Sequence, residues 1–522
     1  MSEICPVQTV SAGARPGPLA STPPGSSYGQ IFKSTAFTGG ASFINILLGV
    51  VRTKVMAVLL GPSGVGLMGL YMTITGLAST LVGMGVGSSG VRQIAEANSN
   101  GDEKQIARTI KTLRRTSSVL GVVGALLLTA LCYPISVLTF GDGAHAVAIA
   151  VLGFAVLFGA VSTGQTALIQ GLRRIADLAQ INVLGALAGT VLGLPLIWFW
   201  RESGIVPLLL VVPAGGLMFS WWFARRVPVA PVSLTVRETA REARALLGLG
   251  LVFMGSGLML AAVAYATRLL IVRQLGMEAA GHYTAAYTLA GIYAGFILQA
   301  MGADFFPRLT AAADDHPTVN RLVNEQTEIA LLMAVPGILG TLTLAPWVIR
   351  VFYAGAFDPA VVVLQWQVLG IFGRIISWPI GFILLAKGER KLFLISESLA
   401  NAIHLGLIWI LVPHAGIAGA GMAFAGLYLF YSVLMVFISR RLTGFRWSAV
   451  NCGLLGWMIP LVVAVFLAML GLPLVWGFPL GLVATVVASG VCFKHLLRRV
   501  PAHRLGRFGF LAGSKTKPSW PL

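Results

Sequence analysis

The sequence predicts an all-α integral membrane protein. Of its 522 residues, 57% are hydrophobic and only 11% are charged, which is far more apolar surface than a soluble protein can bury. The apolar runs repeatedly approach the ~20 residues that a helix needs to cross a bilayer. Because backbone groups in lipid must be satisfied within the segment that carries them, helices are the expected architecture of these runs.

The first segment of the chain, residues 1 to 28, is rich in proline, glycine and serine. It has no apolar core of the kind that a signal peptide needs. We therefore predict a disordered cytoplasmic extension, after which the first apolar helix serves as its own insertion signal.

Fourteen membrane-spanning helices are predicted from the apolar runs that follow. They lie at about 31 to 52, 65 to 90, 117 to 139, 145 to 169, 178 to 199, 205 to 223, 246 to 268, 279 to 303, 327 to 351, 361 to 386, 392 to 412, 416 to 438, 450 to 470 and 474 to 493. The last two are separated by only a few residues around Gly471 to Pro473, so a single re-entrant hairpin is an alternative there.

The distribution of positive charge supports this count. If both termini are cytoplasmic, the segments on the inner side hold 30 of the 37 Lys and Arg residues. Membrane proteins concentrate these residues on cytoplasmic loops, so topology explains the net charge of +19 and we expect no nucleic-acid partner. The basic tail, residues 494 to 522, is expected to lie on the headgroups of membrane lipids.

An internal repeat relates the first six helices to the next six. At a nearly constant separation along the chain, the matched pairs are Arg52 with Arg268, Gly61 with Gly276, Gly66 with Gly281, Arg92 with Arg308, Pro134 with Pro346, Phe140 with Phe352, Gly171 with Gly388 and Arg173 with Arg390. Because six helices separate the copies, both run in the same sense and are related by an axis along the membrane normal.

The repeat divides the chain into two pseudo-symmetric six-helix bundles plus a C-terminal helix pair. We predict a first bundle at 29 to 223, a cytoplasmic amphipathic linker at 224 to 245 and a second bundle at 246 to 438. A two-helix extension follows at 450 to 493. Rocking of one bundle against the other would then give alternating access.

Six cations lie toward the outer side, against the general trend: Arg201, Arg350 and four on the first and seventh predicted helices. Arg52 and Lys54 stand in LGVVRTKVMAVLLG near the end of the first helix, and Arg268 and Arg273 stand near the end of the seventh. They are either snorkelling interfacial anchors or cations that line a cavity. Independent anchors would not share matched spacing, so the repeat favours the cavity for Arg52 and Arg268.

Arg374 lies near the middle of the tenth predicted helix. An arginine at that depth costs ~2.5 to 3.5 kcal/mol on the insertion scale, so it should face protein or water. Glu397 is a candidate ion-pair partner. Glu397 and His404 could alternatively form part of a proton-coupling route, although a membrane histidine is more often a packed, hydrogen-bonded residue.

The four cysteines are Cys5, Cys132, Cys452 and Cys492. They form no CxxC motif and no cluster with histidine, which argues against both a disulfide framework and a metal site. We therefore expect no metal and no cofactor.

Residues 28 to 97 carry a family resemblance. The run YGQIFKSTAFTGGASFINILLGVVRTKVMAVLLGPSGVGLMGLY, followed by GMGVGSSGVRQIAEA, resembles the N-terminal signature of bacterial O-antigen translocases. These form the polysaccharide-transport branch of the multidrug/oligosaccharidyl-lipid/polysaccharide exporter superfamily. LGVVRTKVMAVLLG is also similar to a lipid II flippase motif whose arginine, matched here by Arg52, faces a cationic central cavity. This sequence departs from that motif at Thr53, where an acidic residue is expected, and at Ile46, where a cation is expected.

The resemblance implies a flippase and not an enzyme. Its substrate would be an undecaprenyl-pyrophosphate-linked oligosaccharide, such as an O-antigen repeat unit, moved from the inner to the outer leaflet of the bacterial cytoplasmic membrane. A pyrophosphate is a compact dianion, and guanidinium groups offer it bidentate hydrogen bonds. Arg52 and Lys54 from one bundle and Arg268 and Arg273 from the other are expected to hold it, with Arg374 as a further candidate.

Two other functions remain open. A multidrug cation antiporter of the same superfamily would need acidic residues within its spans, whereas the excess here is basic. A membrane polysaccharide polymerase would usually carry catalytic carboxylates or histidines in a large outer loop, and no outer loop here is long enough. A polysaccharide polymerase or a chain-length protein is instead a possible partner.

Overall fold

The computed structural model describes residues 24–229 and 231–499, and every regular element in these ranges is a helix. Residues 1–23 of the predicted extension and 500–522 of the predicted tail lie outside them. The helices are α1 (Pro24–Gly83), α2 (Val86–Ser99), α3 (Glu103–Ala130), α4 (Cys132–Phe140), α5 (Ala146–Gly171), α6 (Ile175–Trp200), η1 (Arg201–Gly204), α7 (Ile205–Ala224), α8 (Val236–Leu275), α9 (Met277–Ala311), α10 (His316–Phe352), η2 (Gly355–Phe357), α11 (Ala360–Ala386), α12 (Arg390–Ala415), α13 (Ala418–Thr443), α14 (Ala449–Gly471) and α15 (Leu474–Arg499).

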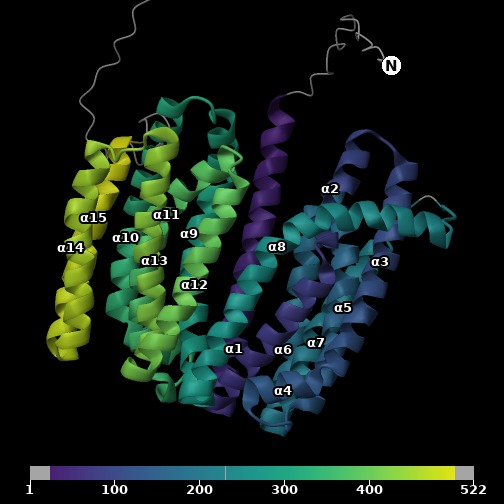
Figure 1. The fold of residues 1–522 in the computed structure, drawn as a ribbon, viewed down its shortest axis with the longest axis horizontal. Helices are drawn as coiled ribbons and strands as arrows, with labels where there is room; N and C mark the ends of the chain where they lie inside the picture. Colours follow the sequence, from purple (N-terminus) through teal and green to yellow (C-terminus); the bar gives the residue numbers. More distant parts are fainter. Residues whose placement is uncertain (1–23, 230, 500–522) are drawn as a thin grey trace, which may run out of the picture.

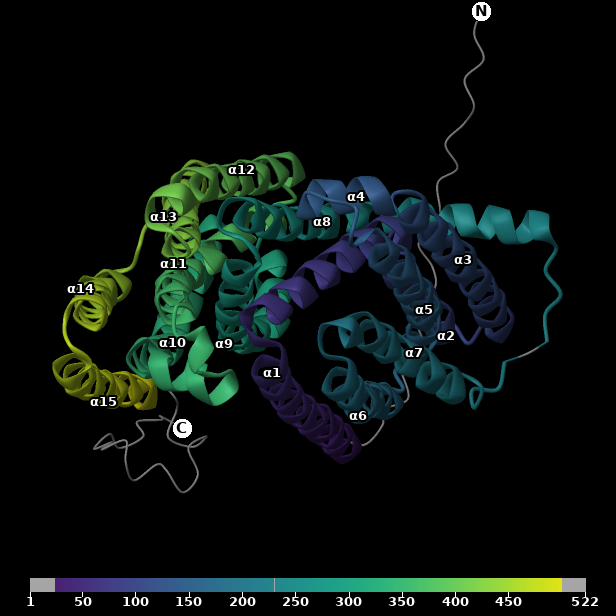
Figure 2. The same ribbon diagram turned by 90° about the horizontal axis from the view of Figure 1, so that it is seen from below.

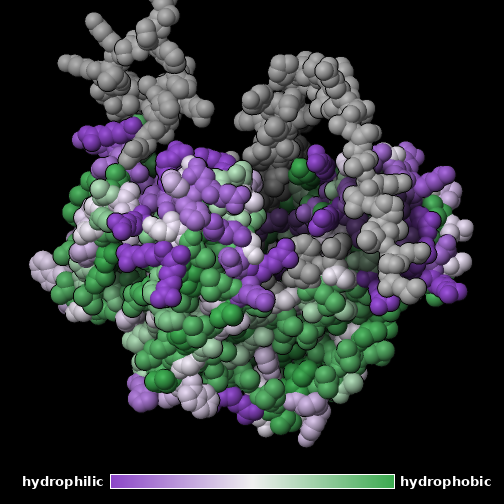
Figure 3. Space-filling model, turned by 45° about the horizontal axis from the view of Figure 1, so that its top comes forward, coloured by the Kyte–Doolittle hydropathy of each residue, from purple (hydrophilic) through white to green (hydrophobic). Residues whose placement is uncertain are grey.

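The all-α membrane architecture is confirmed. Within the described residues, eleven helical segments are long and apolar enough to cross a bilayer. Two of them each contain two successive helices. Ile44–Gly83 is interrupted by a non-helical kink at Gly61 of α1, and Ile175–Ala224 comprises α6 and α7. The count of fourteen spans therefore stays a prediction. Figure 3 shows hydrophobic residues around the body of the molecule, with most hydrophilic residues toward the top and a few at the lower edge, as expected for a membrane-embedded protein.

The helices form two bundles that lie side by side. In Figures 1 and 2, α2 to α7 lie on one side and α9 to α13 on the other, with α1 and α8 between them; the internal repeat assigns α1 to the first bundle and α8 from its apolar part onward to the second. α14 and α15 pack on the far side of the second bundle, where they share its hydrophobic core. Asn451 of α14 donates hydrogen bonds to the backbone oxygen (2.9 Å) and side-chain oxygen (3.0 Å) of Asn324 of α10, which attaches the helix pair.

Backbone conformation supports the internal repeat. Positive φ angles recur at one constant separation along the chain: 66° at Gly61 and 86° at Gly276, 57° at Arg173 and 71° at Gly388, 49° at Arg201 and 59° at Gly416. L-residues other than glycine seldom adopt this conformation, so the recurrence marks equivalent turns. It also corrects the alignment of the two copies at one turn, where Arg173 corresponds to Gly388. The predicted pairs of Gly171 with Gly388 and of Arg173 with Arg390 are therefore wrong.

The two bundles meet where the repeated turns at Gly61 and Gly276 lie. A Cβ atom on Gly66 would lie 2.3 Å from the Met277 carbonyl oxygen, and one on Gly281 would lie 1.9 Å from that of Pro62. The two contacts are reciprocal, because the repeat matches Gly66 to Gly281 and Pro62 to Met277. We name this end of the molecule, which also carries α4, the closed end, and the end carrying the starts of α3 and α8 the linker end (Figure 1).

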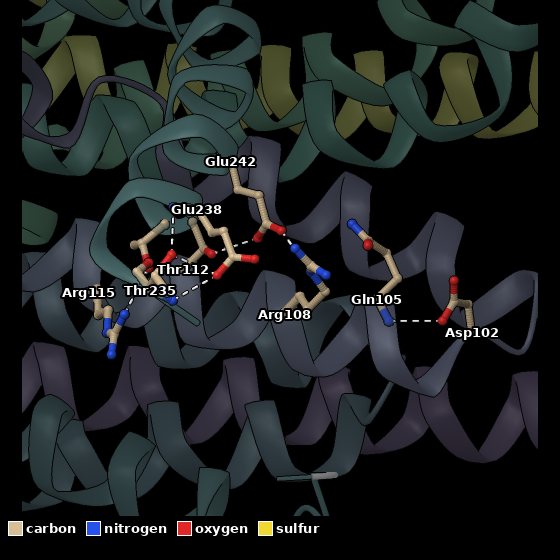
Figure 4. A network of polar contacts seen from close by, with 9 residues as sticks. Asp102, Gln105, Arg108, Thr112, Arg115, Thr235, Glu238 and Glu242 are labelled. Atoms are coloured by element: carbon tan, nitrogen blue, oxygen red, sulfur yellow. Dashed lines mark hydrogen bonds and ion pairs between the residues drawn. The ribbon is translucent and has the colours of Figure 1, made fainter. Parts of the chain in front are cut away.

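The predicted linker is not a separate amphipathic helix. From Val236 it is continuous with the next span as α8, and it is docked on the first bundle at the linker end. Figure 4 shows Glu242 between Arg108 (2.8 Å) and Thr112 (2.8 Å) of α3, so this carboxylate binds the first bundle. Thr235 caps α8, and its backbone N–H and hydroxyl lower the pKa of the Glu238 carboxyl.

Beyond this dock, α8 crosses α2 at a backbone-to-backbone contact. A Cβ atom on Gly85 would lie 2.1 Å from the Gly250 carbonyl oxygen, and one on Gly250 would lie 2.1 Å from that of Met84. Ser89 donates a hydrogen bond of 2.8 Å to the Leu246 carbonyl oxygen beside it. The first turns of α8 are therefore fastened to the first bundle.

Substituting Gly250 with alanine should destabilise the protein by roughly 1 to 3 kcal/mol, because the added methyl overlaps a backbone atom that cannot rotate away. Gly248 is a matched control on the same helix, since a Cβ atom there would meet nothing within 4 Å. Gly248→Ala should be neutral or stabilising by ~0.5 to 1 kcal/mol. Thermal unfolding of both variants in detergent checks this, and equal midpoints would contradict the contact.

Candidate functional site

A cavity of about 1150 Å³ lies between the two bundles. Its wall is formed by α1, α5 and α7 on one side and by α8, α9 and Tyr353 on the other. This volume is slightly above the usual range for ligand pockets, about 300 to 1,000 Å³. The structure brings Arg52 and Arg268 together in this wall, as the repeat predicts.

Arg52 enters the cavity from α1 and is half-buried. Its Nη1 approaches Gly189 of α6, where an added Cβ atom would lie 3.7 Å away, at ordinary van der Waals distance. Among the residues that the structure describes, no hydrogen bond or ion pair involves the Arg52 side chain. Its guanidinium therefore has donors to offer to a ligand.

Arg268 enters from α8 and is only 7% exposed. Its Cζ atom lies 5.3 Å from the ring centre of Tyr287 and 5.7 Å from that of Tyr283, within the range of cation–π attraction. Nη1 donates to the Ala264 carbonyl oxygen at 3.2 Å, but Nε is buried without a partner. No carboxylate in the described ranges neutralises this buried charge.

The electrostatics of the cavity favour an anion. Its wall contains two arginines and no aspartate or glutamate among the described residues. Burying a charge costs free energy unless a partner compensates it, so two unpaired guanidinium groups in a largely apolar wall attract a negative group. Phosphate oxygens suit the planar donor fork of arginine.

Lys54 does not line this cavity, contrary to the prediction. Its Nζ crosses to the second bundle and donates hydrogen bonds to the carbonyl oxygens of Arg350, at 2.6 Å, and of Tyr353. These carbonyls are at the C-terminal end of α10, where the helix has unpaired acceptors and a partial negative charge. Lys54 therefore joins the two bundles at the closed end.

Arg273 makes the reciprocal contact and is also outside the cavity wall. From α8 it crosses to the first bundle, where Nη2 donates to the carbonyl oxygens of Val137 (2.6 Å) and Leu138 (2.7 Å) at the end of α4. The repeat matches Leu138 to Arg350 in the same register that matches Phe140 to Phe352. We name the Lys54 and Arg273 contacts the two latches.

Arg374 and Glu397 lie around one pair of tyrosines but form no ion pair in the described chain. Arg374 Cζ is 5.7 Å from the ring centre of Tyr428. Glu397 accepts a hydrogen bond from the hydroxyl of Tyr431. Their role in the site stays a prediction, and neither side chain is in the wall of the central cavity.

His404 is buried against Phe424, with ring centres 6.2 Å apart, and its Nε2 has no partner within the described ranges. No hydrogen bond in those ranges links it to Glu397. They lie seven residues apart on α12, and the coupling route stays a prediction.

Sequence reasoning missed the aromatic side of the site. Tyr283 and Tyr287 are one helical turn apart on α9, and their rings stack with centres 5.7 Å apart beside Arg268. Their i, i+4 spacing was the available signal, because such pairs lie on one helix face. The backbone carbonyls that accept hydrogen bonds from Lys54 and Arg273 could not be predicted from the sequence, because every residue has a carbonyl.

The chain is similar to known proteins both in sequence and in fold. A family model described as polysaccharide biosynthesis protein matches residues 55–362. The Lipid III flippase of Escherichia coli (strain K12) is 21% identical over 420 residues, which cover 77% of this chain and 96% of the relative. The solved structure of the Lipid II flippase MurJ in an inward closed conformation aligns with a TM-score of 0.66 at 14% identity, covering 88% of this chain and 99% of that one. An inward-facing multidrug resistance MATE family transporter of the MOP superfamily aligns with a TM-score of 0.66 at 16% identity, covering 77% and 95%.

Proposed function

This chain belongs to the polysaccharide biosynthesis protein family, and from that premise we propose that it is a flippase for a lipid-linked oligosaccharide. Its cargo would be an undecaprenyl-pyrophosphate-linked repeat unit of an O-antigen or a related surface polysaccharide. The direction is from the inner to the outer leaflet of the bacterial cytoplasmic membrane, with both termini in the cytoplasm. The observation that carries the proposal is the central cavity, where Arg52 and Arg268 approach from opposite bundles without a carboxylate between them.

In this proposal the two arginines bind the pyrophosphate. A pyrophosphate cannot cross hydrocarbon bare, because an unpaired charge in a low dielectric is costly. Arg52 belongs to the first bundle and Arg268 to the second, so rocking of the bundles changes access to the anion without requiring it to leave its ligands. The linker end faces the cytoplasm by the positive-inside rule, and the closed end faces outward.

A cation antiporter of the same superfamily is the second candidate. Its support is the likeness of fold to a multidrug transporter. Against it stands the described cavity wall, which offers an organic cation two positive charges and no carboxylate.

Reconstitution into vesicles tests the proposed function. We expect the purified protein to bring an undecaprenyl-pyrophosphate-linked oligosaccharide, extracted from the source bacterium, within reach of an impermeant lectin on the opposite leaflet. Protein-free vesicles that contain the same lipid give the background, and permeabilised vesicles give the signal for complete access. Uptake of an organic cation without movement of the glycan lipid would overturn the proposal in favour of the antiporter.

We assign Glu397, hydrogen-bonded to Tyr431, as the candidate proton-coupling group, with His404 as the alternative. A carboxylate within the spans is costly and marks proton routes in transporters. We expect a proton gradient to accelerate flipping by the wild type but not by Glu397→Gln, which keeps the acceptor oxygen. His404→Gln should respond as the wild type does. A gradient response that survives in Glu397→Gln and disappears in His404→Gln would reverse the assignment.

A further inference from the structure

A second cavity adjoins the central one on the linker side. It has a volume of about 730 Å³ and is lined mainly by the inner end of α1 together with α2, α3 and α5 of the first bundle. Four residues line both cavities, namely Ser79, Thr80, Gly159 and Gly257. The two spaces therefore adjoin, and we name the second one the hydroxyl chamber.

The wall of the hydroxyl chamber is rich in uncharged polar groups. Apart from Ser79 and Thr80, these are Ser88, Ser117, Thr163, Thr166 and Gln170. No lysine, arginine, aspartate or glutamate lines it among the described residues. Such a surface cannot hold an ion by charge, but it suits a neutral ligand with many hydroxyl groups.

The chamber offers both acceptors and donors. Thr163 and Thr166 donate their hydroxyl protons to carbonyls of their own helix, Gly159 at 2.9 Å and Ser162 at 3.1 Å, which leaves oxygen lone pairs free to accept. Ser88 and Ser117 make no side-chain hydrogen bond within the described ranges, so their hydroxyls can donate. Sugar hydroxyls, each both donor and acceptor, match this mixture.

The second bundle does not repeat this polarity. In the register that the repeated turns define, Thr163, Thr166 and Gln170 of α5 correspond to Trp378, Gly381 and Leu385 of α11. The hydroxyls are therefore not a consequence of the repeated fold. They distinguish one bundle from the other, as an asymmetric substrate would require.

Glycines keep the boundary between the two cavities open. A Cβ atom on Gly159 would meet nothing within 4 Å, and one on Gly257 would meet only a methyl carbon of Thr80 at 3.5 Å. An extended ligand can thus occupy both spaces at once.

We propose that the hydroxyl chamber is the glycan subsite, in which the first bundle binds the sugar of the lipid-linked oligosaccharide while its pyrophosphate lies between Arg52 and Arg268. This inference rests on the proposed function and adds the place and the residues of sugar recognition. Thr163, Thr166 and Ser88 are its specificity-determining residues, because they supply hydrogen bonds that only a glycan can use.

A binding experiment with two lipids tests the subsite. The probes are undecaprenyl pyrophosphate carrying the oligosaccharide of the source bacterium and undecaprenyl pyrophosphate without sugar. The triple variant Ser88→Ala, Thr163→Val, Thr166→Val should bind the glycan lipid at least roughly 10-fold more weakly, because it loses three groups that hydrogen-bond the sugar. Its affinity for the lipid without sugar should be unchanged. Thr341→Val is the matched control, because Thr341 makes the same bond to its own helix, to Gly337 at 2.7 Å, outside both cavities.

The possible outcomes distinguish failure of the glycan subsite from failure of the proposed flippase function. Equal weakening of both lipids, or no weakening of the glycan lipid, would overturn the subsite. A wild type that binds both lipids equally would overturn the subsite alone. A wild type that binds neither lipid would overturn the flippase and the subsite together. As a second variant, Ala160→Met, at a position that lines the hydroxyl chamber but not the central cavity, should fill the chamber and weaken only the glycan lipid, which keeps the test valid if the triple variant misfolds.

Discussion

Replacing Arg52 and Arg268 together with methionine should abolish flipping of the lipid-linked oligosaccharide. A hydrogen bond to a charged group contributes about 1.5 to 3 kcal/mol, so each single variant should weaken substrate binding by about 10- to 100-fold. Arg→Lys variants should be intermediate, because lysine keeps the charge but loses the bidentate fork. The rate of lectin-accessible glycan appearance in reconstituted vesicles is the measurement.

Stability distinguishes a binding role from an anchoring role in the same variants. Arg268 is buried with no carboxylate partner and with Nε unbonded, so Arg268→Met relieves more burial cost than it loses in contacts and should leave thermal stability unchanged or higher. An interfacial anchor would behave in the opposite way. Arg441→Ala is the control, since Arg441 lies 4.5 Å from the ring centre of Phe437 at the linker end, away from both cavities, and should flip normally. Normal flipping by the double variant would contradict the cavity mechanism.

The sequence was sufficient to predict the cavity arginines because two independent constraints met on them. Each is a cation against the positive-inside trend, and the internal repeat matches one to the other. A symmetry axis between two bundles places matched positions on facing surfaces. Arg52 and Arg268 accordingly line one cavity.

The same reasoning failed for Lys54 and Arg273 for a physical reason. Each follows a cavity arginine closely on the same helix, but a helix turns about 100° per residue, so neither faces the cavity. Their partners are backbone carbonyls, whose availability depends on where α4 and α10 end. That information exists only after the chain has folded.

Turn geometry limited the rest of the prediction. The repeat was matched by residue identity, so glycine was paired with glycine, whereas Arg173 occupies the left-handed position that Gly388 holds in the second copy. A left-handed arginine costs roughly 1 to 2 kcal/mol and has no sequence signal. The continuity of α8 was also not predicted. Its first part is amphipathic and its second part is apolar, and this change of pattern indicates two separate helices although the backbone forms one.

Breaking both latches should open the closed end. Lys54→Met and Arg273→Met each remove charged donors from the C-terminal end of a helix in the opposite bundle. Discounted for solvent exposure, each latch contributes about 1 kcal/mol, so the double variant should shift the equilibrium toward outward opening by about 30-fold. Spin labels can be attached in a cysteine-free background at the exposed positions Tyr133 of α4 and Trp476 of α15. The distance between these two labels should be long in a larger fraction of molecules of the double variant than of the wild type.

A control at the same end isolates the crossing contacts. Arg350 pairs with Asp358 at 2.8 Å within the second bundle, so Arg350→Met removes a cation from the closed end without touching a link between bundles. Its backbone carbonyl remains in place to accept from Lys54. The Arg350→Met distance distribution should match the wild type, and only the latch variants should differ. If all three variants behaved alike, net charge at the closed end rather than bonding across it would set the conformation. A shift confined to Lys54→Met and Arg273→Met would instead mean that transport must break both crossing contacts in every cycle, which makes them a direct control on the flipping rate.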